Sequence, residues 1–368
     1  MKVLFLGGAG DMAVEALREL NREAKRVELV TIVDLDPEKA RKKVGDLGLA
    51  IKTEIEGHDL FDRDWLVAKA GDHDVVLNFA GPFYTTEKYA AEAALAAKKP
   101  YVSISDDYDA YLEIVKLDDE ARKANVKLLT GWGNSPGLTQ ILARKGYNSM
   151  DKCRRINVNW AAGSNEDVGA TNLMHLFHIF HGTTLQTFRG KEIPVKTGEG
   201  RKMVEFPYPM GWLPVYYTGH AESVSLPRNL AGLEEATLHG GVQPPYIPTL
   251  LKTIEKTGLF NTHERRRKAA TFFHKVEGVF ASGGLDKSVG RVDVYGVHQG
   301  KAVYRYYTYI GHIAELTSLP AVQACFWLVD GKFADKPGGV YSGERILVNP
   351  DPFLEELISR GLEIYYYE

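Results

Sequence analysis

The sequence has 368 residues, of which 44% are hydrophobic, so it can bury a large core and is long enough for two domains. With 45 Lys and Arg against 48 Asp and Glu, its formal charge is −3, and no strong field attracts nucleic acid or a membrane surface. Cys153 and Cys325 match no metal-ligand spacing and are too few for a disulfide framework, so we expect a reducing, cytoplasmic location. We expect neither a signal peptide in MKVLFLGGAG nor a membrane-spanning segment.

The N-terminal third of the chain alternates short apolar runs with longer amphipathic ones, the pattern of strands and helices in a parallel sheet. We predict strands at residues 3–6, 27–33, 75–79, 101–104 and 126–130. We predict helices at residues 13–24, 37–44, 86–98 and 110–125. This order favours an α/β fold with a doubly wound parallel sheet of Rossmann type.

From Ile156 onward the strands become longer, with alternating faces and more aromatic residues, which predicts a second, mixed α/β (α+β) domain. Prolines and glycines gather in residues 193–249, where we expect irregular structure. A hairpin is predicted around Gln299 and Gly300, between strands at 291–297 and 302–310.

The segment 314–329 is apolar and is predicted to form a helix that returns to the first domain. On this basis the first domain comprises residues 1–131 and 314–368, and the second comprises residues 132–313.

A glycine-rich loop directly follows the first predicted strand and opens the first predicted helix. Gly8, Gly10 and Ala13 spell G-x-G-x-x-A in this context. We expect Gly8 to permit the tight turn, Gly10 to let the backbone approach a pyrophosphate, and Ala13 to let the helix pack close to the strand. The backbone amides of Asp11 and Met12, at the start of the helix, favour the negative charge of the pyrophosphate. The competing interpretation is that these are only turn glycines.

Asp34 ends the second predicted strand in TIVDLD, 24 residues after Gly10. A carboxylate there accepts hydrogen bonds from the ribose hydroxyls of an adenosine and repels a 2′-phosphate, so it favours NAD over NADP. The alternative is that Asp34 caps the helix that begins at Pro37, but Asp36 is better placed for that role. We therefore expect NAD as the cofactor, with NADP as the alternative.

In an open parallel sheet the ligand binds beyond the carboxyl ends of the strands, so the following loops are the next candidates. Three of these loops, at 80–84, 105–108 and 131–137, are polar or rich in Gly and Pro. Pro136 can begin a helix at about 137–144, whose N-terminus then points into the crevice. We expect nicotinamide or an anionic substrate there, and ordinary turn chemistry is the alternative for each loop.

Five segments of the chain occur together in a recognisable order. They are LFLGGAGDMA at 4–13, KPYVSISDDYDAY at 99–111, NSPGLTQILA at 134–143, GHAESVSLPR at 219–228 and YIGHIAELTSLPAVQA at 309–324. With them, nearly the whole chain resembles the saccharopine dehydrogenase family of pyridine-nucleotide oxidoreductases, which includes lysine 6-dehydrogenase and carboxynorspermidine dehydrogenase types. The resemblance implies a dinucleotide-binding domain, a second mixed domain, often a homodimer, and hydride transfer that forms or breaks a C–N bond.

The resemblance also implies roles for individual residues. Gly8, Gly10, Ala13 and Asp34 would hold the adenosine diphosphate, while the nicotinamide side would be bounded by Ala80, Gly81, Pro82, Phe83, Pro136, Gly137 and Thr317. Leu35 stands where NADP-using relatives commonly carry Arg, which again favours NAD. Asn134 and Ser135 replace the usual acid before Pro-Gly, and this departure leaves the substrate open.

Oxidation of an amine to an imine needs a group that accepts the ammonium proton and a site that holds substrate carboxylates. Asp106 is the first candidate for contact with the amine, and helix capping is its alternative role. Tyr84 and His312 are further acid/base candidates, each with a structural role as the alternative.

Arg228 is suited to clamp a substrate carboxylate, and His220 with Glu222 could line the same wall. The competing interpretation for each is a surface salt bridge.

Histidines at His175, His178 and His181 recur in steps of three along a predicted helix. Each such step turns about 60° around the helix, so the outer pair diverges by about 120° and a shared metal ion is disfavoured. We therefore predict no metal, and we expect a polar stripe that faces the cleft. The basic run 265–268 is expected to be a solvated helix face rather than a phosphate-binding patch.

The sequence thus predicts an NAD-preferring oxidoreductase that acts on a small amino-acid-like substrate, such as a saccharopine- or lysine-like amine, and forms a homodimer. One alternative is an NADP-linked reductase of another imine or of an unsaturated lipid. The other is a catalytically inactive dinucleotide-binding regulator, which a cleft filled by the aromatic residues of 206–217 would favour.

Overall fold

The computed structural model describes residues 1–166, 169–275 and 284–367, and the chain divides into two units. Unit 1 comprises residues 1–137 and 317–346, and unit 2 comprises residues 138–316 and 347–368. The chain passes between them three times, once inside the helix α13 (Ile313–Val329). Of the C-terminal segment expected in the first domain, residues 317–346 lie in unit 1. The expectation is wrong for residues 347–368, which belong to unit 2, where strand β16 (Ile364–Tyr367) pairs with β14 (Lys301–Gly311).

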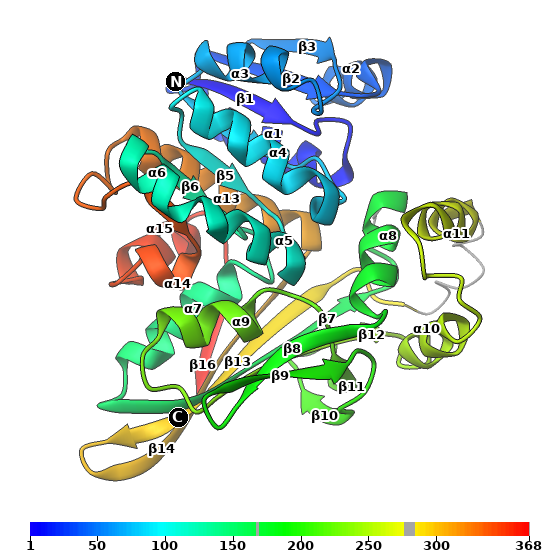
Figure 1. Cartoon of the computed structure of the whole chain (residues 1–368), viewed down its shortest axis with the longest axis vertical. Helices are drawn as coiled ribbons and strands as arrows, with labels where there is room; N and C mark the ends of the chain where they lie inside the picture. The colour runs from blue at the N-terminus through cyan, green and yellow to red at the C-terminus, as the bar shows by residue number, and fades with distance from the viewer. Residues whose placement is uncertain (167–168, 276–283, 368) are drawn as a thin grey trace. The chain divides into compact units, whose positions relative to one another are not determined.

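Unit 1 is built on a seven-stranded sheet in the order β15-β6-β5-β4-β1-β2-β3 (Figure 1). All neighbouring strands are parallel, which confirms the predicted doubly wound sheet. The strands are β1 (Lys2–Leu6), β2 (Leu29–Asp34), β3 (Thr53–Gly57), β4 (Val75–Asn78), β5 (Tyr101–Ser103), β6 (Lys127–Leu129) and β15 (Gly339–Tyr341). Because β1 lies between β2 and β4, the loop after β1 marks the point where the strand order reverses and a ligand site is expected.

Helices cover both faces of this sheet (Figure 1). They are α1 (Asp11–Arg22), α2 (Pro37–Gly45), α3 (Arg63–Gly71), α4 (Phe83–Ala96), α5 (Tyr108–Ile114), α6 (Asp118–Ala124), α14 (Gly343–Ile346) and most of α13. On one face, α3 to α6 pack their apolar residues against Leu4 and Leu6 of β1. The single helix expected at 110–125 is wrong, because a 3₁₀ turn at Val115–Leu117 separates α5 from α6.

The two edge strands of unit 1, β3 and β15, were not predicted. In β3 (TEIEG) glutamates interrupt the apolar pattern, and β15 has only three residues, so neither gives a clear apolar run. The predicted cap of α2 is confirmed, because the Asp36 carboxylate accepts a hydrogen bond of 3.0 Å from the backbone N–H of Lys39.

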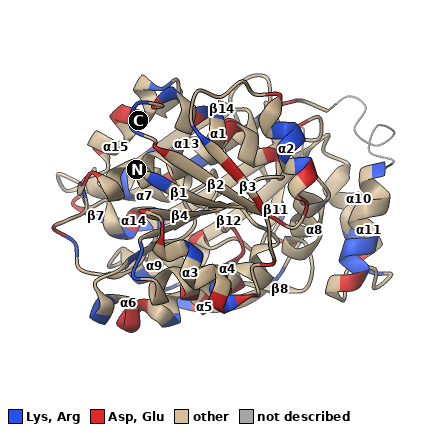
Figure 2. Ribbon diagram, turned by 90° about the horizontal axis from the view of Figure 1, so that it is seen from above, with Lys and Arg blue, Asp and Glu red and all other residues tan. Residues whose placement is uncertain are grey.

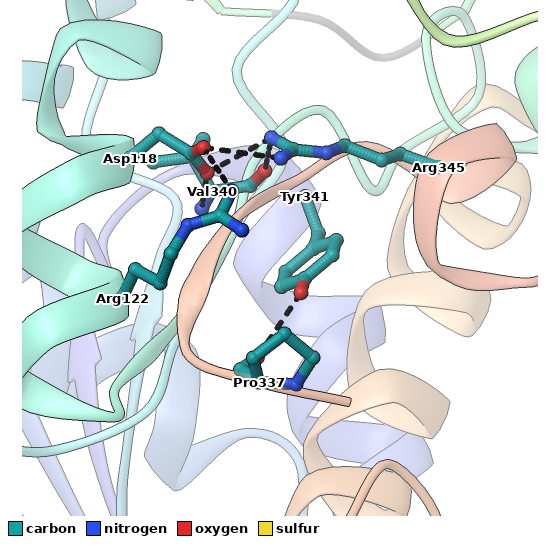
Figure 3. Close-up of polar contacts among 6 residues, drawn as sticks. All are labelled: Asp118, Arg122, Pro337, Val340, Tyr341 and Arg345. Carbon is teal, nitrogen blue, oxygen red and sulfur yellow. Dashed lines mark hydrogen bonds and ion pairs between the residues drawn. The ribbon is translucent and has the colours of Figure 1, made fainter. Parts of the chain in front are cut away.

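An ion-pair cluster around Asp118 attaches β15 and α14 to the rest of unit 1 (Figure 3). Asp118 Oδ1 accepts hydrogen bonds from the backbone N–H of Val340 at 2.8 Å and from Arg345 Nη1 at 2.9 Å. Its Oδ2 accepts from Arg122 Nη2 at 2.8 Å and from Arg345 Nη2 at 3.1 Å. Burial alone would raise the pKa of Asp118, but hydrogen bonds from Arg345, Val340 and Arg122 lower it to about 2.

Unit 2 contains a nine-stranded mixed sheet, which confirms the predicted second domain. Its main path runs β10-β11-β12-β7-β13-β14-β16, with β8 pairing β12 and β9 pairing β8. The strands other than β14 and β16 are β7 (Lys152–Gly163), β8 (Thr183–Phe188), β9 (Lys191–Lys196), β10 (Lys202–Glu205), β11 (Trp212–Tyr217), β12 (Glu235–Gln243) and β13 (Ser288–His298). The predicted hairpin is β13–β14, and its turn residues Gln299 and Gly300 have φ of 52° and 76°.

The expectation of irregular structure at 193–249 is wrong, because the range contains the regular elements β10, β11, β12 and α9 (Glu222–Asn229) together with the end of β9. Several of its prolines lie where no backbone donor is needed, as in the turn between β10 and β11 that contains Pro207 and Pro209. The other helices of unit 2 are α7 (Leu138–Asn148), α8 (Ala170–Ile179), α10 (Ile247–Glu255), α11 (His263–Lys275) and α15 (Asp351–Ser359).

The basic run 265–268 lies on α11, where Figure 2 shows a band of Lys and Arg. Lys268 pairs with Glu264 of the same helix, and Arg266 is buried and donates to the carbonyl of Phe260 at 2.7 Å. None of the described helices combines the length and apolar character needed to cross a bilayer.

We expect Asp118→Asn to destabilise the protein at pH 7 by about 1 kcal/mol, discounting the pKa shift because the group is partly exposed. A depressed pKa stabilises the folded state above the unfolded pKa near 4, and this contribution is lost as pH falls toward 2. Urea unfolding at several pH values measures the effect. Asp119→Asn, in the same helical turn but exposed, is the matched control. This role would be contradicted if both variants lost the same free energy of unfolding, or if the difference between Asp118→Asn and wild type did not change with pH.

Candidate functional site

The glycine loop after β1 packs closely against its neighbours. Gly7 has φ of 87°, and a Cβ there would lie 2.6 Å from the backbone of Phe79 and Ala80. The left-handed turn residue is therefore Gly7, and the expectation that Gly8 supplies it is wrong. Gly8 is required for another reason, because its Cβ would lie 2.0 Å from Ile32 Cγ2.

Asp34 faces this loop from the end of β2. Its Oδ2 accepts a hydrogen bond of 2.8 Å from the backbone N–H of Ala9, and its Oδ1 accepts one of 2.9 Å from that of Asp36. These bonds fix the carboxylate beside the start of α1, where Gly10 provides no side-chain cap. Each oxygen can accept a second hydrogen bond, so the carboxylate can still bind ribose hydroxyls. The loop, the uncapped helix start and Asp34 together fit an adenine dinucleotide.

The next predicted cofactor residues lie on elements that pack around this loop. Asp11 forms an ion pair with Lys43, the carbonyl of Met12 accepts from Ser318 Oγ of α13 at 2.9 Å, and Ala13 is fully buried. The packing that was expected of Ala13 is therefore present.

Thr317, also on α13, packs against the loop after β6. A Cβ on Gly133 of that loop would lie 3.3 Å from Thr317 Cγ2. The loop closes on itself, because the backbone N–H of Gly133 donates to the carbonyl of Pro136 at 3.1 Å and Gly137 has φ of 123°. Within unit 1, the structure thus brings Pro136, Gly137 and Thr317 together.

A buried acid, Glu87 of α4, ties the carboxyl ends of three strands together. It accepts hydrogen bonds from Asn78 Nδ2 at 3.3 Å, the hydroxyl of Tyr101 at 2.7 Å, Ser103 Oγ at 2.6 Å and Thr130 Oγ1 at 2.9 Å. Burial raises the pKa of Glu87, and the hydrogen bonds partly oppose this rise. Glu87 was not predicted, although it shares a helical stripe with the buried residues Ala90, Ala91 and Ala94, which was the available signal.

The Glu87 network continues into the loop that is predicted to flank the nicotinamide ribose. Asn78 Oδ1 accepts from the backbone N–H of Ala80 at 3.0 Å, and the carbonyl of Ala80 accepts from Thr86 Oγ1 at 2.5 Å. These bonds shape the segment Ala80, Gly81 and Pro82 before α4 begins at Phe83.

The acids after β5 have different positions. The carboxylate of Asp107 is buried and accepts from the backbone N–H of Tyr84, in the first turn of α4, at 3.0 Å. Asp106 is half-buried and lies in the loop after β5, which ends at Ser103. Asp107 therefore has a structural role, while Asp106 and Tyr84 keep their catalytic assignment as a prediction.

In unit 2, His220 lies in a buried aromatic and imidazole stack. Its ring is stacked on Trp160 with centroids 5.1 Å apart and 7° between the planes, and its Nε2 lies 3.1 Å from Nε2 of His175. Burial lowers the pKa of His220 well below its usual value, and the neighbouring His175 lowers it further. His220 is therefore neutral, and one of the two facing ring nitrogens donates to the other. The sequence did not predict that His175 and His220 meet.

The other two predicted substrate residues have protein partners in unit 2. Glu222 is fully buried, and its Oε1 accepts from Thr139 Oγ1 at 2.7 Å. Arg228 forms a two-pronged ion pair with Glu192, with distances of 2.8 and 2.9 Å, as the competing interpretation stated. A substrate role for either residue remains a prediction.

His312 stands at the junction of β14 and α13 with partners on both ring nitrogens. Its Nε2 accepts from Lys287 Nζ at 2.9 Å, and its Nδ1 lies 3.7 Å from Glu166 Oε2. Glu166 Oε1 in turn accepts from the backbone N–H of Ile313 at 3.0 Å. The amine and the imidazole share a hydrogen bond through which a proton could pass, whereas the imidazole and the carboxylate are too far apart for one. Lys287 was not predicted, because nothing in its local sequence distinguishes it from a surface lysine.

The histidines of α8 and its end do not share one ligand direction. His175 faces His220, whereas His181 Nδ1 lies 3.3 Å from Glu255 Oε1. His175 and His181 thus have different partners, and the absence of a metal ion stays a prediction.

Comparison with known proteins supports the sequence resemblance. Residues 3–129 match the family described as the saccharopine dehydrogenase NADP binding domain. No match is found among curated proteins.

Solved structures share the fold over the full chain. Apo saccharopine dehydrogenase (L-Glu forming) from Saccharomyces cerevisiae matches with a TM-score of 0.70 and 15% identity, covering 100% of both chains. The homospermidine synthase from Legionella pneumophila, in complex with NAD, matches with a TM-score of 0.61 and 11% identity, covering 100% of this chain and 91% of that one. Residues 3–129 therefore match the saccharopine dehydrogenase NADP binding domain, in agreement with the resemblance of the motifs, and the whole chain shares the fold of these two structures.

Proposed function

We propose that this protein is an NAD-preferring dehydrogenase that oxidises a C–N bond of an amino acid or an amino-acid-derived secondary amine. Its substrate would resemble saccharopine or lysine. The observation that carries the proposal is the Asp34 carboxylate, held by the amides of Ala9 and Asp36 beside an uncapped helix start. The family match to an NADP-binding domain supports dinucleotide binding. The preference for NAD rests on two residues. Asp34 would repel the 2′-phosphate of NADP, and its neighbour Leu35 carries no positive charge that could bind this phosphate.

The bound dinucleotide would accept a hydride from the carbon that bears the amine. The residues of the chain must then hold the substrate and remove the ammonium proton before that transfer. Asp106 is the proposed group beside the amine, since a half-buried carboxylate can pair with an ammonium or accept its proton. The hydrogen-bonded pair of His312 and Lys287 is proposed as a second acceptor for the proton.

The hydrogen-bonded pair of His220 and His175 is proposed to line the substrate side. The neutral His220 imidazole can hydrogen-bond polar groups without adding charge, and the Trp160 ring holds it in a fixed orientation. The regulator alternative is not supported, because Phe206 and Leu213 pack with Ala161 and Val289 in an apolar cluster of unit 2. We further propose a homodimer, in line with the family resemblance.

The decisive screen offers lysine, saccharopine and related amines with NAD or NADP and follows absorbance at 340 nm. We expect reduction of NAD with at least one amino-acid-derived amine. If NADH binds but no amine is oxidised, the proposed reaction is wrong, and the assignment of the dinucleotide-binding site is unaffected.

We expect the wild type to bind NADH about tenfold more tightly than NADPH, a difference of about 1.4 kcal/mol. Asp34→Asn removes the charge and keeps an oxygen acceptor for one of the two amides, so the ratio should approach one. Fluorescence titration measures both affinities. Asp36→Asn is the matched control, since Asn also caps a helix well, and it should leave the ratio unchanged. Tighter binding of NADPH by the wild type would overturn the assignment.

With a substrate from the screen, Asp106→Asn should lower kcat by about 10²-fold, in the range of general acid–base catalysis, with little change in NADH affinity. Asp109→Asn, in the first turn of α5, is the control and should retain turnover. Unchanged turnover for Asp106→Asn would remove this residue from the chemistry.

A further inference from the structure

The start of α1 has no side-chain cap. Its N-cap residue is Gly10, which offers no oxygen to the first amides of the helix. The dinucleotide motif requires this glycine, because the backbone must approach a pyrophosphate here. A Cβ on Gly10 would also lie only 3.2 Å from the carbonyl oxygen of Gly7. The partial positive charge of the helix start is therefore not offset by a capping side chain.

Asp11 places a full negative charge at this helix start. It is the first residue of α1 and the acidic residue of its first turn. Helical side chains tilt toward the N-terminus, so the carboxylate lies close to the amides that the helix presents. An acid in this position stabilises the start of a helix through the helix dipole. A pyrophosphate that binds the same amides meets this carboxylate as a like charge.

The carboxylate of Asp11 has a cationic partner from another helix. Lys43 Nζ of α2 donates to Asp11 Oδ1, and the side chains of Lys43 and Asp11 are 24% and 25% exposed. Among the residues that the structure describes, no other Lys or Arg has a hydrogen bond or ion pair with residues 7–13. Lys43 thus differs from the other basic residues of α2, which are exposed: Lys39, Arg41 and Lys42.

The position of this ion pair gives it more weight than an ordinary surface pair. Both side chains are about three-quarters covered, whereas Arg41 and Glu38 of the same helix form a pair whose side chains are 50% and 81% exposed. Salt and water screen a covered pair less than an exposed one. The Lys43 charge therefore offsets the Asp11 charge at the place where a diphosphate has to approach.

We propose that Lys43 sets the affinity for the dinucleotide by neutralising Asp11, so that the pyrophosphate binds at the start of α1 without repulsion from the first-turn acid. Lys43 is a positioning residue in this role, because it acts on the cofactor through Asp11. NAD and NADP share the pyrophosphate, so the effect is the same for both and is separate from the discrimination assigned to Asp34. The proposal rests on the dinucleotide-binding site and does not depend on the proposed oxidation of an amine.

Lys43→Met tests the proposal, since Met keeps an unbranched apolar chain and removes the charge. We expect the affinities for NADH and NADPH to fall by the same factor, about fivefold, as for one charge at a partly covered helix start. Fluorescence titration measures both, and displacement of NADH by ADP-ribose should show the same loss, because ADP-ribose keeps the pyrophosphate and lacks nicotinamide. Lys43→Arg should bind like the wild type. Lys42→Met, which removes the neighbouring exposed charge, is the matched control and should also bind like the wild type.

A second variant separates the charge effect from a loss of structure. In the double variant Asp11→Asn with Lys43→Met, the acid that Lys43 neutralises is gone, so the affinity should return to within about twofold of the wild type. The single and the double variant both lack the ion pair, and a general destabilisation would therefore affect both alike. The deficit of Lys43→Met relative to the wild type should also shrink as the salt concentration rises.

Three results would overturn the proposal. An unchanged affinity of Lys43→Met would show that Asp11 does not repel the cofactor. A loss confined to NADPH would assign Lys43 to the 2′-phosphate. A loss that persists in the double variant would mean that Lys43 acts on the cofactor directly or through the structure of α2, and not through Asp11.

Discussion

The arrangement of the dinucleotide unit depends on one buried carboxyl group. Glu87 gathers hydroxyl and amide donors from the ends of β4 and β5 and from Thr130 just after β6. An acid without a cationic partner is costly to bury, so the network persists only if each of these groups keeps its position. The loops that follow the strands therefore start from fixed points, and the segment from Ala80 to Pro82 takes its shape from Asn78, which Glu87 holds.

This constraint also bears on the two adjacent acids that follow β5, Asp106 and Asp107. Asp107 uses its carboxylate to hold the start of α4, on which Glu87 lies one turn further along. Asp106 is its immediate neighbour in the chain. Asp107 thus positions the helix that carries Glu87, and Asp106 is the acid to which we assign the proposed chemistry.

Much of unit 1 followed from the sequence because its signals are local. Apolar runs bounded by glycine and proline give β1, β2, β4, β5 and β6, and the order of the glycine loop and Asp34 predicts the cofactor class. Contacts between distant segments could not be obtained in this way. The contacts of His175 with His220 and of Lys287 with His312 produce no periodic pattern in the sequence, because each depends on sheet register and on the path of a loop. Gly7 was not predicted because the G-x-G-x-x-A motif begins at Gly8, whereas the residue with positive φ is the one before it.

The three crossings of the chain between its units have a consequence for how such a protein can diversify. Unit 1 is complete only with α13 and β15, which are encoded after nearly all of unit 2, and unit 2 takes its edge strand β16 from the last residues. Recombination at a single junction would leave both halves lacking a structural element. An exchange of either unit between relatives needs matched junctions at all three crossings, one of them within a continuous helix. Variation of the substrate side is therefore expected to arise by point substitution and loop change within unit 2, rather than by replacement of a whole module.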